Sequence, residues 1–153
     1  MTPQVWIAIV VGLAAMIDDL ARRQISNWIS VAALGAGFAW QMAHSGWMGA
    51  AYALAGSAVG MAVFLIFYLL GGMGGGDVKL MGGFGALLGA GGVMWAALLI
   101  AGVGGIMAVC AIVWKRVRRM AGGNKHEDGE RKESIPYAPA IALGVWLSLV
   151  PRG

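Results

Sequence analysis

The sequence is poor in charged residues. Only 12% of its 153 residues are Asp, Glu, Lys or Arg, whereas a soluble domain carries roughly 25%. Apolar residues make up 59% of the chain, which is more than the core of a soluble protein of this length needs. This composition argues against an ordinary soluble enzyme and predicts a protein embedded in a lipid bilayer.

Residues that serve several familiar chemistries are also scarce. Cys110 is the single cysteine, so the chain can form neither an internal disulfide nor a CxxC metal pair. No HExxH sequence is present, and the two histidines, His44 and His126, fall in different connections. Ser57 has no histidine beside it in the sequence, which disfavours a serine peptidase. We therefore expect no metal ion and no cofactor.

The two ends of the chain bear on its domain organisation. Residues 1–4 contain no Lys or Arg, whereas a secretory signal peptide has a basic stretch before its apolar run. We therefore expect the first apolar segment to be a retained helix. Residues 149–153 match most of a thrombin cleavage site. The expectation is one membrane-embedded domain over residues 1–150, with residues 151–153 as an expression remnant.

Six apolar segments predict an all-α bundle of about six transmembrane helices. They are Pro3–Ile17, Trp28–Met42, Ala50–Leu70, Val78–Ala90, Val93–Trp114 and Tyr137–Val150. A straight crossing needs roughly 20 residues, and only the third and fifth segments reach that length. The fourth is rich in glycine, so we expect it to pack inside the bundle.

The basic residues predict the orientation in the membrane. Three of the five connections are charged: Asp18–Asn27, Gly71–Asp77 with Lys79 just beyond, and Lys115–Ser134. The connections around His44–Gly49 and Gly91–Gly92 carry no charge. If the helices alternate in direction, one face holds ten of the eleven Lys and Arg residues. The positive-inside rule then places that face in the cytoplasm and both termini outside. This basic face accounts for the net charge without a nucleic-acid partner.

Three carboxylates lie at ends of the apolar segments on this face: Asp18, Asp19 and Asp77. Ionisable groups at membrane depth are costly and commonly functional. Two carboxylates from separate helices are the minimum for an aspartic peptidase, in which one takes a proton from water and the other donates to the scissile carbonyl. Two structural alternatives stay open: an ordinary charged flank for Asp19, and a helix N-cap for Asp77.

The sequence resembles the type IV prepilin peptidases at three places. Residues 74–79, GGGDVK, resemble the GxGD motif of that family, and residues 19–27, DLARRQISN, resemble its first aspartate motif, D-x-R-x-x-x-I-P-N. Residues 135–140, IPYAPA, resemble the segment before its last helix. The three motifs occur in the family order and frame most of the chain. Ala21 and Ser26 depart from the usual Arg and Pro.

The resemblance implies a membrane-embedded aspartic endopeptidase of the inner (cytoplasmic) membrane. It would cut the leader of a prepilin-like membrane protein after a glycine, at the cytoplasmic face and just before the pilin's hydrophobic helix. It implies the following roles: Asp19 and Asp77 as catalytic residues, with Gly74, Gly76, Lys79 and Asn27 binding substrate or shaping the loop. Asp19 lies at the position that the spacing of the motif requires, whereas Asp18 lies one residue before that position. We expect Arg22 and Arg23 to hold the charge of Asp19.

The absence of cysteine pairs refines this interpretation. Larger members of the family carry a cysteine-bearing cytoplasmic segment and also methylate the new pilin terminus. This chain resembles the compact, peptidase-only form associated with Flp/Tad-type pili, so no methyltransferase activity is expected.

Other readings of the same features stay open. Among membrane aspartic peptidases with the GxGD motif, the second candidate is the preflagellin or presenilin-like branch. From other classes, a small transporter or channel subunit and a non-enzymatic membrane scaffold are alternatives. A homo-oligomer is also left open.

Overall fold

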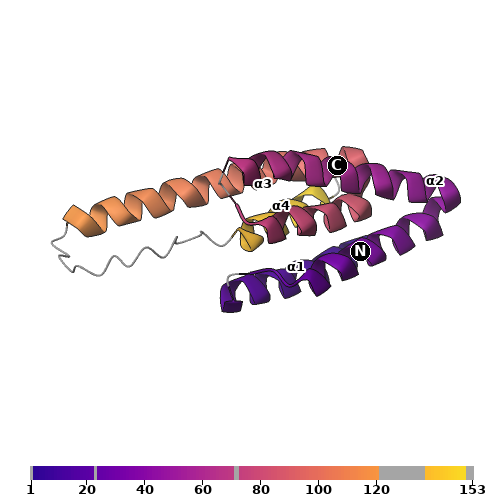
Figure 1. The fold of residues 1–153 in the computed structure, drawn as a ribbon, viewed down its shortest axis with the longest axis horizontal. Coiled ribbons are helices and arrows are strands. Elements are labelled where there is room, and N and C mark those ends of the chain that lie inside the picture. Colours follow the sequence, from indigo (N-terminus) through magenta and orange to yellow (C-terminus); the bar gives the residue numbers. More distant parts are fainter. Residues whose placement is uncertain (1, 23, 71–72, 121–136, 151–153) are drawn as a thin grey trace.

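The computed structural model describes residues 2–22, 24–70, 73–120 and 137–150, which form four helices (Figure 1). These are α1 (Pro3–Arg22), α2 (Asn27–Leu69), α3 (Gly75–Met120) and α4 (Ala138–Ser148). Three of them contain stretches long and apolar enough to cross a membrane, and α4 is a shorter apolar helix. The all-α class is confirmed, and the chain is a multi-pass membrane protein. Residues 151–153 and most of the connection expected at Lys115–Ser134 lie outside the described residues.

The first uncharged connection is a kink inside α2 and not a separate loop. Ser45 and Gly46 leave the helical conformation, and Gly46 has φ 55°, in the left-handed region that glycine tolerates best. The helix doubles back at this point (Figure 1). Added at Gly49, a Cβ atom would overlap the backbone carbonyl of Gln41. The two arms of α2, residues 27–44 and 47–69, therefore form a tight hairpin.

The second uncharged connection, expected at Gly91–Gly92, is a break in α3 at Gly89, two residues earlier. Gly89 has φ 71° and ψ 172°. The carbonyl of Leu87, beside the break, accepts hydrogen bonds from the side-chain amides of Gln4 at 2.9 Å and Gln41 at 3.2 Å. A buried carbonyl that loses its helical partner needs such donors. The break divides α3 into arms of residues 75–88 and 90–120.

The first arm of α3 packs between the two arms of α2. Residues 81–87 are all buried, which confirms that this glycine-rich segment lies inside the bundle. A Cβ atom added at Gly83 would lie 2.6 Å from the Cβ of Ala33 in the first arm of α2. Gly56 of the second arm makes a similarly close contact with Gly85. Small residues permit this approach of helix backbones in a membrane, where packing drives association.

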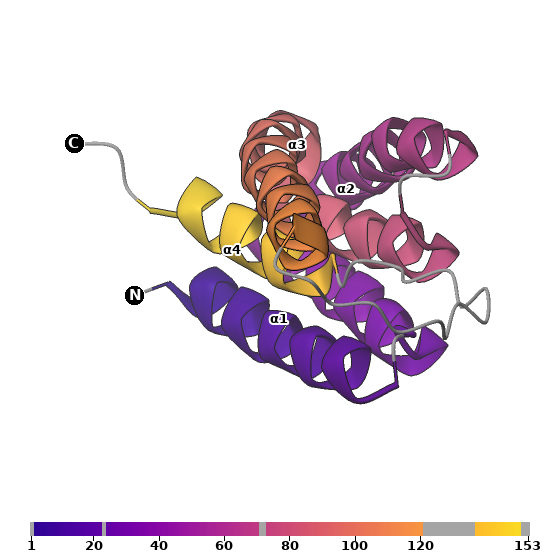
Figure 2. The same cartoon turned by 90° about the vertical axis from the view of Figure 1, so that its left-hand side faces the viewer.

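Helices α1 and α4 are neighbours (Figure 2) and run antiparallel. The indole nitrogen of Trp146 donates a hydrogen bond to the carbonyl of Ala8 at 3.0 Å. At the other end, the backbone of Ala138 contacts Asp19. The start of α1 and the end of α4 therefore lie at one end of the bundle, and Asp19 lies at the other. Helix α1 ends at Arg22, five residues beyond the predicted Ile17.

Candidate active site

A polar cavity of about 440 Å³ lies where the α1–α2 connection meets the start of α3. It is lined by Asp19, Gln24, Ile25, Asn27, Gly74, Gly75, Gly76, Asp77 and Lys79. All six residues that the sequence marks as site residues are among them. Two charged connections that are about 50 residues apart in the sequence therefore meet at one end of the bundle.

Asp19 lies in the last turn of α1 with only 8% of its surface exposed. Its Oδ2 accepts a hydrogen bond of 3.2 Å from the backbone N–H of Ala138, the first residue of α4. The N–H groups of a first helical turn have no partner within their helix and favour a negatively charged acceptor. A helix 119 residues away in sequence therefore fixes this carboxylate.

Asp77 is the third residue of α3 and is 7% exposed. Its Oδ2 accepts a hydrogen bond of 3.0 Å from the N–H of Gly74, the residue just before the helix. This geometry is one half of a capping box, in which the side chain at the third position reaches back to the N-cap backbone. The alternative in which Asp77 is itself the N-cap is wrong. The other oxygen, Oδ1, takes part in no hydrogen bond with the described residues.

The carboxyl groups of Asp19 and Asp77 line the same cavity, one from the end of α1 and the other from the start of α3. A reaction that activates a water and protonates a carbonyl needs one carboxyl as proton acceptor and a second as proton donor. Two carboxyls on one cavity can take these two roles.

Asp18 has a structural role and does not line the cavity. Its Oδ2 accepts a hydrogen bond of 2.7 Å from the N–H of Ser26, and its Oδ1 lies 3.6 Å from Nε of Arg22. The expectation that Arg22 holds the charge of Asp19 is therefore wrong. Asp18 precedes Arg22 by four residues, a spacing that brings two side chains together on a helix surface. Arg23 lies outside the described residues.

Contacts between the two connections hold the cavity in shape. A Cβ atom added at Gly76 would lie 3.1 Å from the Cβ of Ile25, so the backbone at the start of α3 packs directly on the α1–α2 connection. On the rim, Nζ of Lys79 donates a hydrogen bond of 3.0 Å to Oδ1 of Asn27. This bond joins the starts of α2 and α3. Both contacts fix the separation of the elements that carry the carboxylates.

Sequence reasoning missed four contributors to this site. Gln24, Ile25 and Gly75 line the cavity from within the two aspartate motifs. Ala138 supplies the hydrogen bond to Asp19. The IPYAPA segment was a signal that this part of the chain matters, but nothing in the sequence indicated its contact with Asp19. Within the part of the chain that the structure describes, no three His, Cys, Asp or Glu side chains are grouped so that they could hold a metal ion.

Comparison with known proteins gives one match. The model of a family described as the type IV leader peptidase family matches residues 6–112. This range includes most of α1, all of α2, both carboxylates of the cavity and most of α3. No curated protein and no solved structure matches the chain.

Proposed function

The chain belongs to the type IV leader peptidase family, whose members are aspartic peptidases that act on prepilins, and we propose that Asp19 and Asp77 are its catalytic pair. The observation that carries this proposal is their arrangement. They are buried, they come from two different helices, and they face one polar cavity at a single end of the bundle.

In the proposed reaction, a water molecule between the carboxyls attacks the scissile carbonyl carbon. The ionised carboxylate takes the water proton, and the protonated carboxyl donates its proton to the carbonyl oxygen. The tetrahedral intermediate then collapses: the C–N bond breaks, the leaving amine takes a proton from one carboxyl, and the other carboxyl accepts a hydroxyl proton of the intermediate, which restores the pair. The hydrogen bonds from Ala138 and Gly74 orient the two groups throughout.

Four further residues of the cavity bind and position the substrate backbone. Gly74 and Gly76 lie beside Asp77 and have no side chain to hinder an extended peptide. Asn27 and Lys79 lie on the rim and offer polar groups to the same peptide. The substrate is a prepilin-like precursor cut after a glycine, just before its hydrophobic helix.

The kinks in α2 and α3 determine the membrane topology that we propose. Each arm of α2 and α3 crosses the bilayer, so that α1, the four arms and α4 make six crossings. The cavity then opens at the cytoplasmic face of the inner membrane, because ten of the eleven basic residues belong to connections on that side. Both termini lie outside.

The enzyme is a compact, peptidase-only member of the family, as in Flp/Tad-type systems. The single cysteine supports this part of the proposal, because it leaves no cysteine pairs for the segment that accompanies methylation in larger members. A transporter is less well supported. Transporter sites lie near the bilayer midplane, whereas Asp19 and Asp77 lie within a turn of helix ends.

The test is cleavage of a prepilin-like precursor by the purified chain in lipid nanodiscs, in the presence of a methyl donor. We expect mass spectrometry to show a product that starts directly after the glycine and has an unmodified N-terminus. An intact precursor, with enzyme that is folded by circular dichroism, contradicts the peptidase assignment. A methylated product contradicts only the peptidase-only part.

A further inference from the structure

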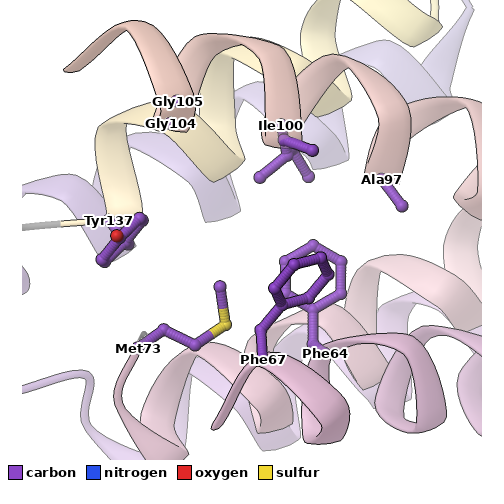
Figure 3. Close-up of a pocket in the computed structure, with 9 residues that line it drawn as sticks. Phe64, Phe67, Met73, Ala97, Ile100, Gly104, Gly105 and Tyr137 are labelled. Atoms are coloured by element: carbon purple, nitrogen blue, oxygen red, sulfur yellow. The ribbon is translucent and has the colours of Figure 1, made fainter. Parts of the chain in front are cut away.

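A second cavity, of about 210 Å³, lies between the second arm of α2 and the second arm of α3 (Figure 3). It is apolar. The rings of Phe64 and Phe67 point into it from one side, and Ile100 faces them from the other (Figure 3). Phe64 is 2% exposed and Phe67 is 41% exposed, so the cavity opens at the surface of the bundle.

Two short segments connect this apolar cavity to the polar one. Met73 lines the apolar cavity, and the next residue, Gly74, lines the polar cavity and donates to Asp77. Tyr137 lines the apolar cavity, and the next residue, Ala138, donates to Asp19. Consecutive Cα atoms are about 3.8 Å apart. Consecutive residues, Met73 and Gly74, therefore line the two cavities beside Asp77, and Tyr137 of the apolar cavity precedes the residue that binds Asp19.

We propose that the apolar cavity is the subsite for the first large apolar side chains that follow the scissile bond of the substrate. This inference rests on the proposed function. An extended peptide advances roughly 3.3 Å per residue, so a chain held at the carboxylates presents its next one or two side chains at the junction with the apolar cavity. Only the side of the cleavage point where the hydrophobic helix begins suits such a lining, because a polar segment would lose hydration there without gaining a polar partner.

The open side of the cavity suits this occupant. The substrate segment after the cut is a hydrophobic helix that lies in the bilayer, so its side chains arrive from the lipid. The Phe64 and Phe67 rings, with centroids 6.1 Å apart and planes at 56°, offer an apolar contact at that opening. A lipid acyl chain is the competing occupant.

The glycines of α3 provide a matched pair of variants. Gly105 lines the cavity, and a Cβ atom there would meet nothing within 4 Å, so Gly105→Leu fills space without a direct clash. Gly102 also has nothing within 4 Å, but it does not line the cavity. Gly102→Leu therefore adds the same side chain to the same helix at a neutral position.

The first readout compares two precursors with leucine or alanine at both of the first two positions after the cut. We expect the wild type to favour the leucine precursor by at least about tenfold in kcat/KM, as is typical for filling an apolar pocket. Gly105→Leu should remove this preference, and Gly102→Leu should retain it. Equal cleavage of the two precursors by the wild type would overturn the inference, as would a preference that survives in Gly105→Leu.

The second readout does not require turnover. A precursor with benzoylphenylalanine at the first position after the cut is photolysed with the Asp77→Asn variant in nanodiscs. Adducts on Met73 or Phe67 support the subsite. Adducts only on lipid, or on helices away from the cavity, contradict it. If the wild type cleaves neither precursor while the adducts still form at the cavity, the proposed peptidase function fails and the apolar binding site stands.

Discussion

The backbone N–H of Ala138 donates a hydrogen bond of 3.2 Å to Oδ2 of Asp19, so the N-terminus of α4 holds a carboxylate at the end of α1. This contact makes the last helix part of the proposed catalytic centre, although it contributes no side chain to the polar cavity. Packing between α1 and α4 sets its position. A Cβ atom at Gly12 would lie 2.9 Å from the indole nitrogen of Trp146, so the two helices are in close contact beyond the site.

The first prediction removes this donor. Replacing Ala138 by lactic acid turns its N–H into an ester oxygen and changes little else. A hydrogen bond to a charged group contributes about 1.5–3 kcal/mol, so kcat should fall roughly 10- to 100-fold, with KM little changed because substrate contacts remain. The matched control is the ester at Ile141, whose N–H bonds to the carbonyl of Tyr137 and not to Asp19. Equal loss in both esters would show that Ala138 acts only through helix stability.

The second prediction separates the neighbouring carboxylates. Asp19→Asn should lose nearly all cleavage, because the proposed mechanism needs a carboxyl in the cavity. Asp18→Asn should keep substantial cleavage, because its partners are Ser26 on the α1–α2 connection and Arg22 at the end of α1. Cleavage rates at equal membrane levels of the two proteins make the comparison. An inactive Asp18→Asn protein together with an active Asp19→Asn protein would show that Asp18, and not Asp19, is the catalytic residue.

The third prediction compares two glycines of the motif. A Cβ atom at Gly76 would lie 3.1 Å from Ile25, whereas at Gly74 its nearest neighbour would be 3.5 Å away. Gly76→Ala should therefore cost about 1–3 kcal/mol in packing and lower kcat/KM by roughly tenfold or more. Gly74→Ala should change the rate by about twofold. Equal effects of the two substitutions would show that the fit against Ile25 does not limit the site.

The fourth prediction concerns topology. In a Cys110→Ser background, Trp47→Cys beside the α2 kink should react with a membrane-impermeant maleimide in intact cells, because Trp47 is 86% exposed and the proposed topology places the kink outside. Gln24→Cys, exposed at the opposite end, should react only after the membrane is opened. The reverse pattern would place the cavity on the outer face.

Much of the bundle could be predicted because apolar composition and alternating connections determine which ends lie together. That logic placed Asp19 and Asp77 on one face before their geometry was known. It marked uncharged connections at His44–Gly49 and Gly91–Gly92 but not their form, because non-helical angles at Ser45–Gly46 and at Gly89 alone redirect the helices there. It also missed Ala138, because the contact with Asp19 depends on how α1 and α4 pack along their whole length.

The most direct test of the account is the rate at which Asp77→Asn cleaves a prepilin-like precursor. Asparagine keeps the oxygen that accepts the hydrogen bond from Gly74, so the start of α3 should remain intact. It cannot take or donate the catalytic proton. We predict a loss in kcat/KM of at least the ~10²–10⁴-fold typical of positioned acid–base groups, with the thermal unfolding temperature of the protein unchanged. Near-normal cleavage by a correctly folded Asp77→Asn protein would contradict the two-carboxylate mechanism.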